Sequence, residues 1–190
     1  MQNKLSRIKA PRQPPTNLRR RAVIRNLVEL GLSALVPLAS SFAHASSLIV
    51  GQSAPPLTLH TLDGRNFATT DLIGYVVVIT FWASYCEPCK EELPALSAYA
   101  ESHKKSGLEV LGFCIDSPDN VAEVSKIAST LSFPVGFLGS QYAGDYGRIW
   151  RMPVSFVIDR KGRLIDNGWN DKQPIWNKER FHRVLDPLFS

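Results

Sequence analysis

The sequence has few cysteines: only Cys86, Cys89 and Cys114 occur among its 190 residues. Small exported domains that depend on disulfides for their stability carry more, so a disulfide framework is excluded. A zinc site usually needs four ligands in recognisable motifs, and beyond Cys86 and Cys89 no second Cys-x-x-Cys or Cys/His pair is present. We therefore expect no metal and no bound cofactor other than a redox-active disulfide between Cys86 and Cys89.

Long hydrophobic runs are also lacking. The uncharged apolar stretch from Leu30 to Phe42 is shorter than the ~20 residues that a membrane-spanning helix requires, and Pro37 interrupts it. Membrane anchoring is therefore expected only if this leader stays attached to the chain.

Acidic residues are scarce at the N-terminus, where residues 1–45 contain eight basic side chains and the single acid Glu29. This segment accounts for the net charge of +5, and the remaining chain is slightly acidic. The excess positive charge thus indicates a targeting segment and not a nucleic-acid surface.

Residues 1–45 have the three parts of an export signal. A basic start precedes the apolar stretch Leu27–Phe42, and Ala43-His44-Ala45 forms a small-x-small cleavage site. Arg20-Arg21 resembles a twin-arginine signal, whereas an ordinary signal with an arginine-rich start fits equally well. We expect cleavage after Ala45, one domain over residues 46–190, and a periplasmic or otherwise extracytoplasmic location.

The mature chain alternates between strand and helix patterns. Asp63-Gly64 is typical of a type I′ hairpin turn between Leu57–Leu62 and Arg65–Phe67. Apolar runs predict the other strands and helical spacing predicts the helices: strands at 76–81, 108–115, 135–138, 154–158 and 163–165, and helices at 86–105, at 121–131 and after a cap at Asn177. The order predicts an α/β fold with a central mixed β-sheet, helices on both faces and an N-terminal β-hairpin.

Cys86-Glu87-Pro88-Cys89 lies where the strand at 76–81 leads into a helix. Disulfide exchange needs an attacking thiolate and a second thiol that resolves the mixed disulfide. A helix start stabilises the Cys86 thiolate through its free N–H groups, and Pro88 suits the first turn. An inert structural disulfide is disfavoured because so short a loop gives little stability.

The acids near this pair bear on its redox potential. Glu87, together with Glu91 and Glu92, places negative charge near Cys86, which disfavours the thiolate and favours a reductant. Lys90 opposes this effect.

The segment Phe81-Trp82-Ala83-Ser84-Tyr85-Cys86-Glu87-Pro88-Cys89-Lys90-Glu91-Glu92-Leu93-Pro94, read with Ala54-Pro55, Leu62-Asp63-Gly64 and Met152-Pro153, resembles the TlpA/ResA-like branch of the thioredoxin superfamily. The resemblance implies a thioredoxin-like fold and an exported or membrane-anchored thiol:disulfide oxidoreductase. It further implies disulfide-bearing exported proteins as partners, often apocytochrome c, and a membrane thiol carrier as the electron donor.

By resemblance, Cys86 is the nucleophile, Cys89 the resolving cysteine, and Glu92 a carboxyl that accepts the proton of Cys89. A solvated helix glutamate is the alternative for Glu92. Thr80 stands where thioredoxin has a buried aspartate, which strengthens the case for Glu92.

The resemblance also implies the residues that meet the substrate. Pro153 matches the family's cis-proline, although an ordinary strand-start proline is the alternative. An extended substrate would pair beside it as an added strand. Trp82 matches the residue beneath the active site, Pro94 a helix kink, and Tyr85 replaces a more usual tryptophan. The expected substrate-binding residues are Trp82, Tyr85, Glu87, Pro88, Met152 and Pro153.

Other interpretations remain open at this point. The protein could be an oxidant or isomerase of exported proteins, a copper- or haem-handling chaperone using the same thiols, or a peroxiredoxin, which shares the Ala-Pro and Asp-Gly opening. Cys114 is interpreted as a small buried hydrophobe, with a regulatory thiol as the alternative. Trp150, Trp169 and Trp176 belong either to the core or to a partner surface.

Overall fold

The computed structural model describes residues 48–172 and 174–190, so the predicted export signal lies outside the described residues. Seven strands are described: β1 Thr58–His60, β2 Asn66–Ala68, β3 Val76–Trp82, β4 Leu108–Cys114, β5 Val135–Phe137, β6 Val154–Ile158 and β7 Leu164–Asn167. The α-helices are α1 Glu87–His103, α2 Val121–Ala128 and α3 Lys178–Arg180. Short helical turns are η1 Thr69–Leu72, η2 Lys104–Ser106, η3 Pro118–Asn120, η4 Gly144–Tyr146, η5 Phe181–Leu185 (a π-helical turn) and η6 Asp186–Leu188.

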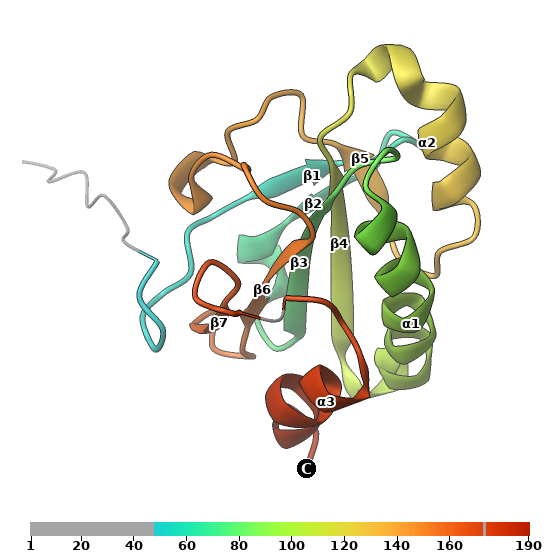
Figure 1. Ribbon diagram of the computed structural model, residues 1–190. Helices are drawn as coiled ribbons and strands as arrows, with labels where there is room; N and C mark the ends of the chain where they lie inside the picture. The colour runs from blue at the N-terminus through green and yellow to red at the C-terminus, as the bar shows by residue number, and fades with distance from the viewer. Residues whose placement is uncertain (1–47, 173) are drawn as a thin grey trace, which may run out of the picture. The chain divides into compact units, whose positions relative to one another are not determined.

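The central sheet has five strands in the order β5-β4-β3-β6-β7 (Figure 1). β3, β4 and β5 run parallel, whereas β6 pairs antiparallel with β3 and β7 antiparallel with β6. The predicted mixed sheet is thus confirmed, and β6 and β7 form an antiparallel hairpin at its edge. Because β3 and β4 are parallel, their carboxyl ends meet at one edge of the sheet.

β3 lies at the centre of the sheet, and all seven of its residues are buried. Its side chains alternate between two apolar clusters, as the two-residue period of a strand requires. Val76, Val78 and Trp82 belong to one cluster, and Val77, Ile79 and Phe81 to the other. This explains the uninterrupted apolar sequence of the strand, since both faces are covered.

Helical cover differs between the two faces of the sheet. The buried apolar residues of α1, α2 and η5 all join the cluster that contains Val78 and Trp82. The opposite face is covered by β1, η1 and η4. For residues 48–172 and 174–190, the prediction of helices on both faces holds with α-helices on one face and short 3-10 turns on the other. Positive φ angles at Gly139, Gly144 and Gly147 turn the chain in the segment that covers this second face.

The N-terminal hairpin forms as a separate two-stranded sheet of β1 and β2. The prediction of a two-residue turn at Asp63-Gly64 is wrong: the Thr61 N–H donates to the Arg65 carbonyl at 2.9 Å, so the loop that this pair closes has three residues, Leu62, Asp63 and Gly64. The Thr61 hydroxyl donates to the Arg65 carbonyl and to the Asp63 carboxylate, and it accepts the Arg65 N–H at 2.8 Å. These side-chain bonds hold a wider loop, which a count of turn-forming residues does not reveal.

The last two predicted helices are shorter or less regular than expected. α2 ends at Ala128, and the hydroxyls of Ser129 and Thr130 then donate to backbone carbonyls of its last turn. Asn177 caps α3 as predicted, accepting the Arg180 N–H at 2.9 Å. In the described part of the chain, no helix combines the length and apolar character needed to cross a membrane.

Candidate active site

Cys86 and Cys89 form a disulfide at the junction of β3 and α1, with their Cα atoms 5.3 Å apart. Cys86 is the N-cap residue of α1, and its sulfur accepts the backbone N–H of Cys89 at 3.3 Å. Free N–H groups and the helix dipole at this position stabilise negative charge on a thiolate. The predicted strand-to-helix junction is confirmed.

The two cysteines differ in exposure. Cys86 is 8% exposed, whereas Cys89 is completely buried. Tyr85, Glu87 and Pro88 surround Cys86 and are all exposed. Of the two cysteines, Cys86 is therefore the one with surface that a second protein can contact.

Asp116 braces the loop that carries Cys86. Its carboxylate accepts the Ser84 N–H at 2.9 Å and the Ser84 hydroxyl at 2.5 Å, together with the Cys114 thiol and the Asn120 amide. Burial opposes ionisation of Asp116, yet these hydrogen bonds, led by those from Ser84, lower its pKa below the ordinary value. Sequence reasoning singled out no role for Asp116. The parallel pairing of β3 with β4 is the signal that could have placed it beside residues 83–86.

Glu87 pairs with Lys90 at 2.6 Å on the exposed side of the first helical turn. Lys90 thus partly neutralises the negative charge of Glu87 near Cys86, as the sequence suggested. Because both side chains are exposed, water and salt screen what remains of the effect.

Glu92 lies on the face of α1 that carries Cys89, three residues further along the helix. It is 1% exposed, so the alternative of a solvated glutamate is wrong. Its Oε2 accepts the backbone N–H of Trp176 at 2.8 Å, and Oε1 has no hydrogen-bond partner in residues 48–172 and 174–190. Burial raises the pKa of Glu92 to about 7, against the lowering effects of the Trp176 N–H and of Arg180.

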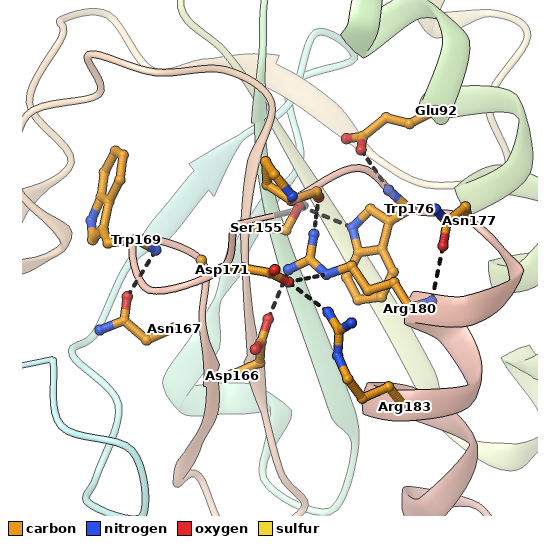
Figure 2. Close-up of polar contacts among 12 residues, drawn as sticks. Glu92, Ser155, Asp166, Asn167, Trp169, Asp171, Trp176, Asn177, Arg180 and Arg183 are labelled. Atoms are coloured by element: carbon orange, nitrogen blue, oxygen red, sulfur yellow. Dashed lines mark hydrogen bonds and ion pairs between the residues drawn. The ribbon is translucent and has the colours of Figure 1, made fainter.

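Trp176 links Glu92 to the sheet. Its indole N–H donates to the Ser155 hydroxyl at 3.0 Å, and the Ser155 hydroxyl donates to Thr80 at 3.0 Å. Arg180 lies against the ring, with its guanidinium carbon 4.1 Å from the ring centroid (Figure 2). Sequence reasoning found neither the position of Trp176 beside Glu92 nor any role for Arg180 and Ser155.

The Met152-Pro153 peptide bond is cis, as the resemblance implied. Pro153 is buried, and Met152 is half-buried between the two apolar clusters. Trp82 is completely buried in the cluster that also contains both active-site cysteines.

Cys114 is completely buried in β4, and its thiol donates to Asp116 at 3.2 Å. Burial raises the pKa of this thiol to about 12, so it stays protonated at neutral pH. These properties fit the interpretation of Cys114 as a small buried side chain.

The three C-terminal tryptophans separate into different environments. Trp176 is buried, Trp169 is half-buried, and Trp150 is 71% exposed. Trp150 and Trp169 stack with ring centroids 5.7 Å apart, and Arg151 lies over both rings. Trp176 thus belongs to the core and Trp150 to the surface, and Trp169 lies between the two.

Among the residues that the structure describes, no group of three or more His, Cys, Asp or Glu side chains is placed to hold a metal ion.

Comparison with known proteins identifies relatives of this chain. Residues 50–166 match the model of the AhpC/TSA family. The chain is 30% identical to the thiol-disulfide oxidoreductase ResA of Geobacillus thermodenitrificans over 161 residues, which cover 82% of this chain and 92% of the relative. ResA of Bacillus thuringiensis is 29% identical over 126 residues, covering 66% and 72% of the two chains.

A solved structure supports the same assignment. A candidate thiol:disulfide interchange protein DsbE from Chlorobium tepidum is 30% identical, with a TM-score of 0.55, and the match covers 63% of this chain and 84% of that one. The predicted thioredoxin-like fold and the resemblance to ResA-like proteins are confirmed.

Proposed function

The chain belongs to the AhpC/TSA family as a ResA-like thiol-disulfide oxidoreductase, and from this premise we propose that it reduces disulfides of exported proteins, such as apocytochrome c, outside the cytoplasm. The observation that carries the proposal is the Cys86–Cys89 pair at the start of α1, where Cys86 keeps a small exposed surface and Cys89 is completely buried. This arrangement separates the roles of attacking and resolving thiol.

The reaction begins from the reduced pair. The Cys86 thiolate attacks one sulfur of a substrate disulfide, which forms a mixed disulfide and releases the other substrate sulfur as a thiolate. Cys89 then loses its proton and attacks Cys86, so that the Cys86–Cys89 disulfide forms and the second substrate sulfur leaves. Two electrons have passed to the substrate, and a membrane thiol carrier restores the dithiol by the reverse exchange.

Glu92 is the proposed proton acceptor for Cys89. A base works best when its pKa lies near the ambient pH, and burial brings the pKa of Glu92 to about 7. Water reaches neither Cys89 nor Glu92 easily, since both are almost fully buried. A carboxylate three residues away on the same helix face therefore replaces solvent as the acceptor.

The substrate is proposed to bind as an extended segment beside the Met152-Pro153 peptide, with Met152 and Pro153 forming one side of the site. Tyr85, Glu87 and Pro88 are exposed around Cys86 and would contact the substrate directly, above the buried Trp82.

Export is part of the proposal and rests on the features of residues 1–45. We propose that this leader is removed after Ala45 and that residues 46–190 act as a thioredoxin-like domain in the periplasm or an equivalent compartment. Mass spectrometry of protein recovered from the extracytoplasmic fraction tests this, with a mature N-terminus at Ser46 as the expected result. Full-length protein confined to the cytoplasm would contradict it.

Trapping tests the substrate. The variant Cys89→Ser should retain Cys86 in mixed disulfides, and mass spectrometry should identify cysteine-bearing exported proteins there. Cys86→Ser is the matched control and should capture none. If Cys89→Ser holds only glutathione, substrate-specific reduction is refuted.

The direction of electron flow is tested by the reduction potential of the Cys86–Cys89 pair in glutathione or dithiothreitol buffers. A reductant should lie near the thioredoxin value of about −270 mV, whereas a value near the DsbA value of about −120 mV would establish an oxidant.

A further inference from the structure

We propose that Arg180, acting through Trp176, is a positioning residue that sets the location and protonation of Glu92. The inference deepens the proposed function, because it depends on Glu92 being the carboxyl that serves Cys89. Three features carry it: the burial of Arg180, its contact with Trp176, and the bond from Trp176 to Glu92.

Arg180 is a buried cation, 1% exposed, near the C-terminus of the chain. Its Nη2 lies 2.7 Å from Asp166, its Nε 3.3 Å from Asp171, and its Nη1 donates to the Pro174 carbonyl. Burying an arginine is costly unless its charge is paired. These three contacts stabilise the guanidinium and hold it in one place.

Arg180 in turn holds Trp176. The guanidinium carbon lies 4.1 Å from the centroid of the indole, within the range of a cation–π contact. Phe181 stacks on the same side chain with centroids 5.3 Å apart, and the indole N–H is bonded to Ser155. Trp176 is therefore fixed by contacts on its ring and on its edge.

The fixed position of Trp176 determines where its backbone N–H points. This N–H donates to Glu92 Oε2 at 2.8 Å and is the one hydrogen bond that Glu92 receives from the described residues (Figure 2). A hydrogen bond to the carboxylate favours its charged form, as does the positive charge of Arg180. Arg180 thus acts on Glu92 in two ways: through its own positive charge, and through Trp176, which it holds in place.

The charged groups around Glu92 determine in which direction its pKa should change when one of them is removed. Arg180 is the cation that acts on it, and Asp166 and Asp171 partly cancel that charge from the far side of the guanidinium. Arg183 pairs with Asp171 at 2.8 Å. On α1, the Cys86–Cys89 disulfide carries no charge in the oxidised protein. Removing Arg180 should therefore raise the pKa of Glu92, and removing Asp166 should lower it.

The test is a pH titration of the Glu92 side-chain carboxyl by ¹³C NMR in the oxidised full-length protein. In Arg180→Gln, the pKa of Glu92 should rise by at least about half a unit, since nearby opposite charge lowers a carboxyl pKa by one unit or more. Arg180→Lys keeps the charge and should restore most of the wild-type value. Arg183→Gln is the matched control; because the Arg183 side chain is largely exposed and screened by water, this change should raise the pKa of Glu92 clearly less than Arg180→Gln does.

If Arg180→Gln does not fold, Asp166→Asn provides the second test. Because it removes a negative charge near Arg180, it should lower the pKa of Glu92. The inference is overturned if the pKa of Glu92 is unchanged in Asp166→Asn and, where that variant folds, in Arg180→Gln. It is also overturned if Arg183→Gln raises the pKa of Glu92 as much as Arg180→Gln does. If the predicted shifts occur but Glu92→Gln resolves mixed disulfides at the wild-type rate, the positioning role is supported and only the proposed role of Glu92 as proton acceptor fails.

Discussion

Replacing Glu92 by glutamine should change how the stability of the oxidised protein depends on pH. Folding raises the pKa of Glu92 from 4.5 to about 7, because the carboxyl is buried. The folded state therefore holds the proton more tightly than the unfolded state does. The protonated Glu92 carboxyl therefore contributes to the free energy of unfolding. This contribution is fully present below about pH 4.5 and is lost as the pH rises through about 7.

The size of the effect follows from the shift. One pKa unit corresponds to about 1.4 kcal/mol, so ionisation of Glu92 should lower the free energy of unfolding by about 3 kcal/mol across this interval. Glutamine at position 92 remains neutral and keeps an oxygen that can accept the Trp176 N–H. The variant should therefore lack this loss and should exceed the wild type in stability at pH 8.

Urea unfolding at pH 5 and pH 8 measures the difference for the wild type and for Glu92→Gln. Glu91→Gln is the matched control, because Glu91 is the exposed neighbour on the same helix. The control should show the wild-type dependence on pH. If Glu92→Gln shows that same dependence, Glu92 is already charged in the folded protein, and the argument from burial is wrong.

Three further changes test other parts of the structure. Asp116→Ala removes the acceptor of the Ser84 N–H and the Cys114 thiol, and it should cost about 2–4 kcal/mol in urea unfolding; an unchanged midpoint would contradict the bracing role. Cys114 should resist iodoacetamide at pH 8 in the folded protein and react once unfolded, since its pKa is raised to about 12; rapid labelling of the native state would refute its burial. Gly136→Ala would place a Cβ against the His60 carbonyl and should destabilise the protein by about 1–3 kcal/mol, measured by thermal unfolding; a neutral effect would show that β1 does not pack there.

Local features of the fold were predictable from the sequence. The apolar run of β3 requires cover on both faces, and the sheet indeed buries all of it. Asn177 carries a side chain that caps helices, and it does so for α3. Such features depend on residues that are close in the sequence, which is why a sequence pattern reports them.

Features that depend on the combined geometry of several neighbouring residues were predicted less well. The loop after β1 is wider than Asp63-Gly64 indicated, because Thr61 and Arg65 bond across it. In the described part of the chain, one sheet face carries short 3-10 turns, and the segment over it turns at Gly139, Gly144 and Gly147, which no single motif displays.

The sequence by itself determined the redox pair and its place at a strand-to-helix junction, since Cys86, Pro88 and Cys89 act within one helical turn. Only the tertiary structure decided the state of Glu92. Glu92 is buried, and its one hydrogen bond from the described residues comes from Trp176, which is 84 residues away in the chain. Because the protonation of a carboxyl depends on its solvation and on the charges nearby, it was settled when the C-terminal segment packed against α1.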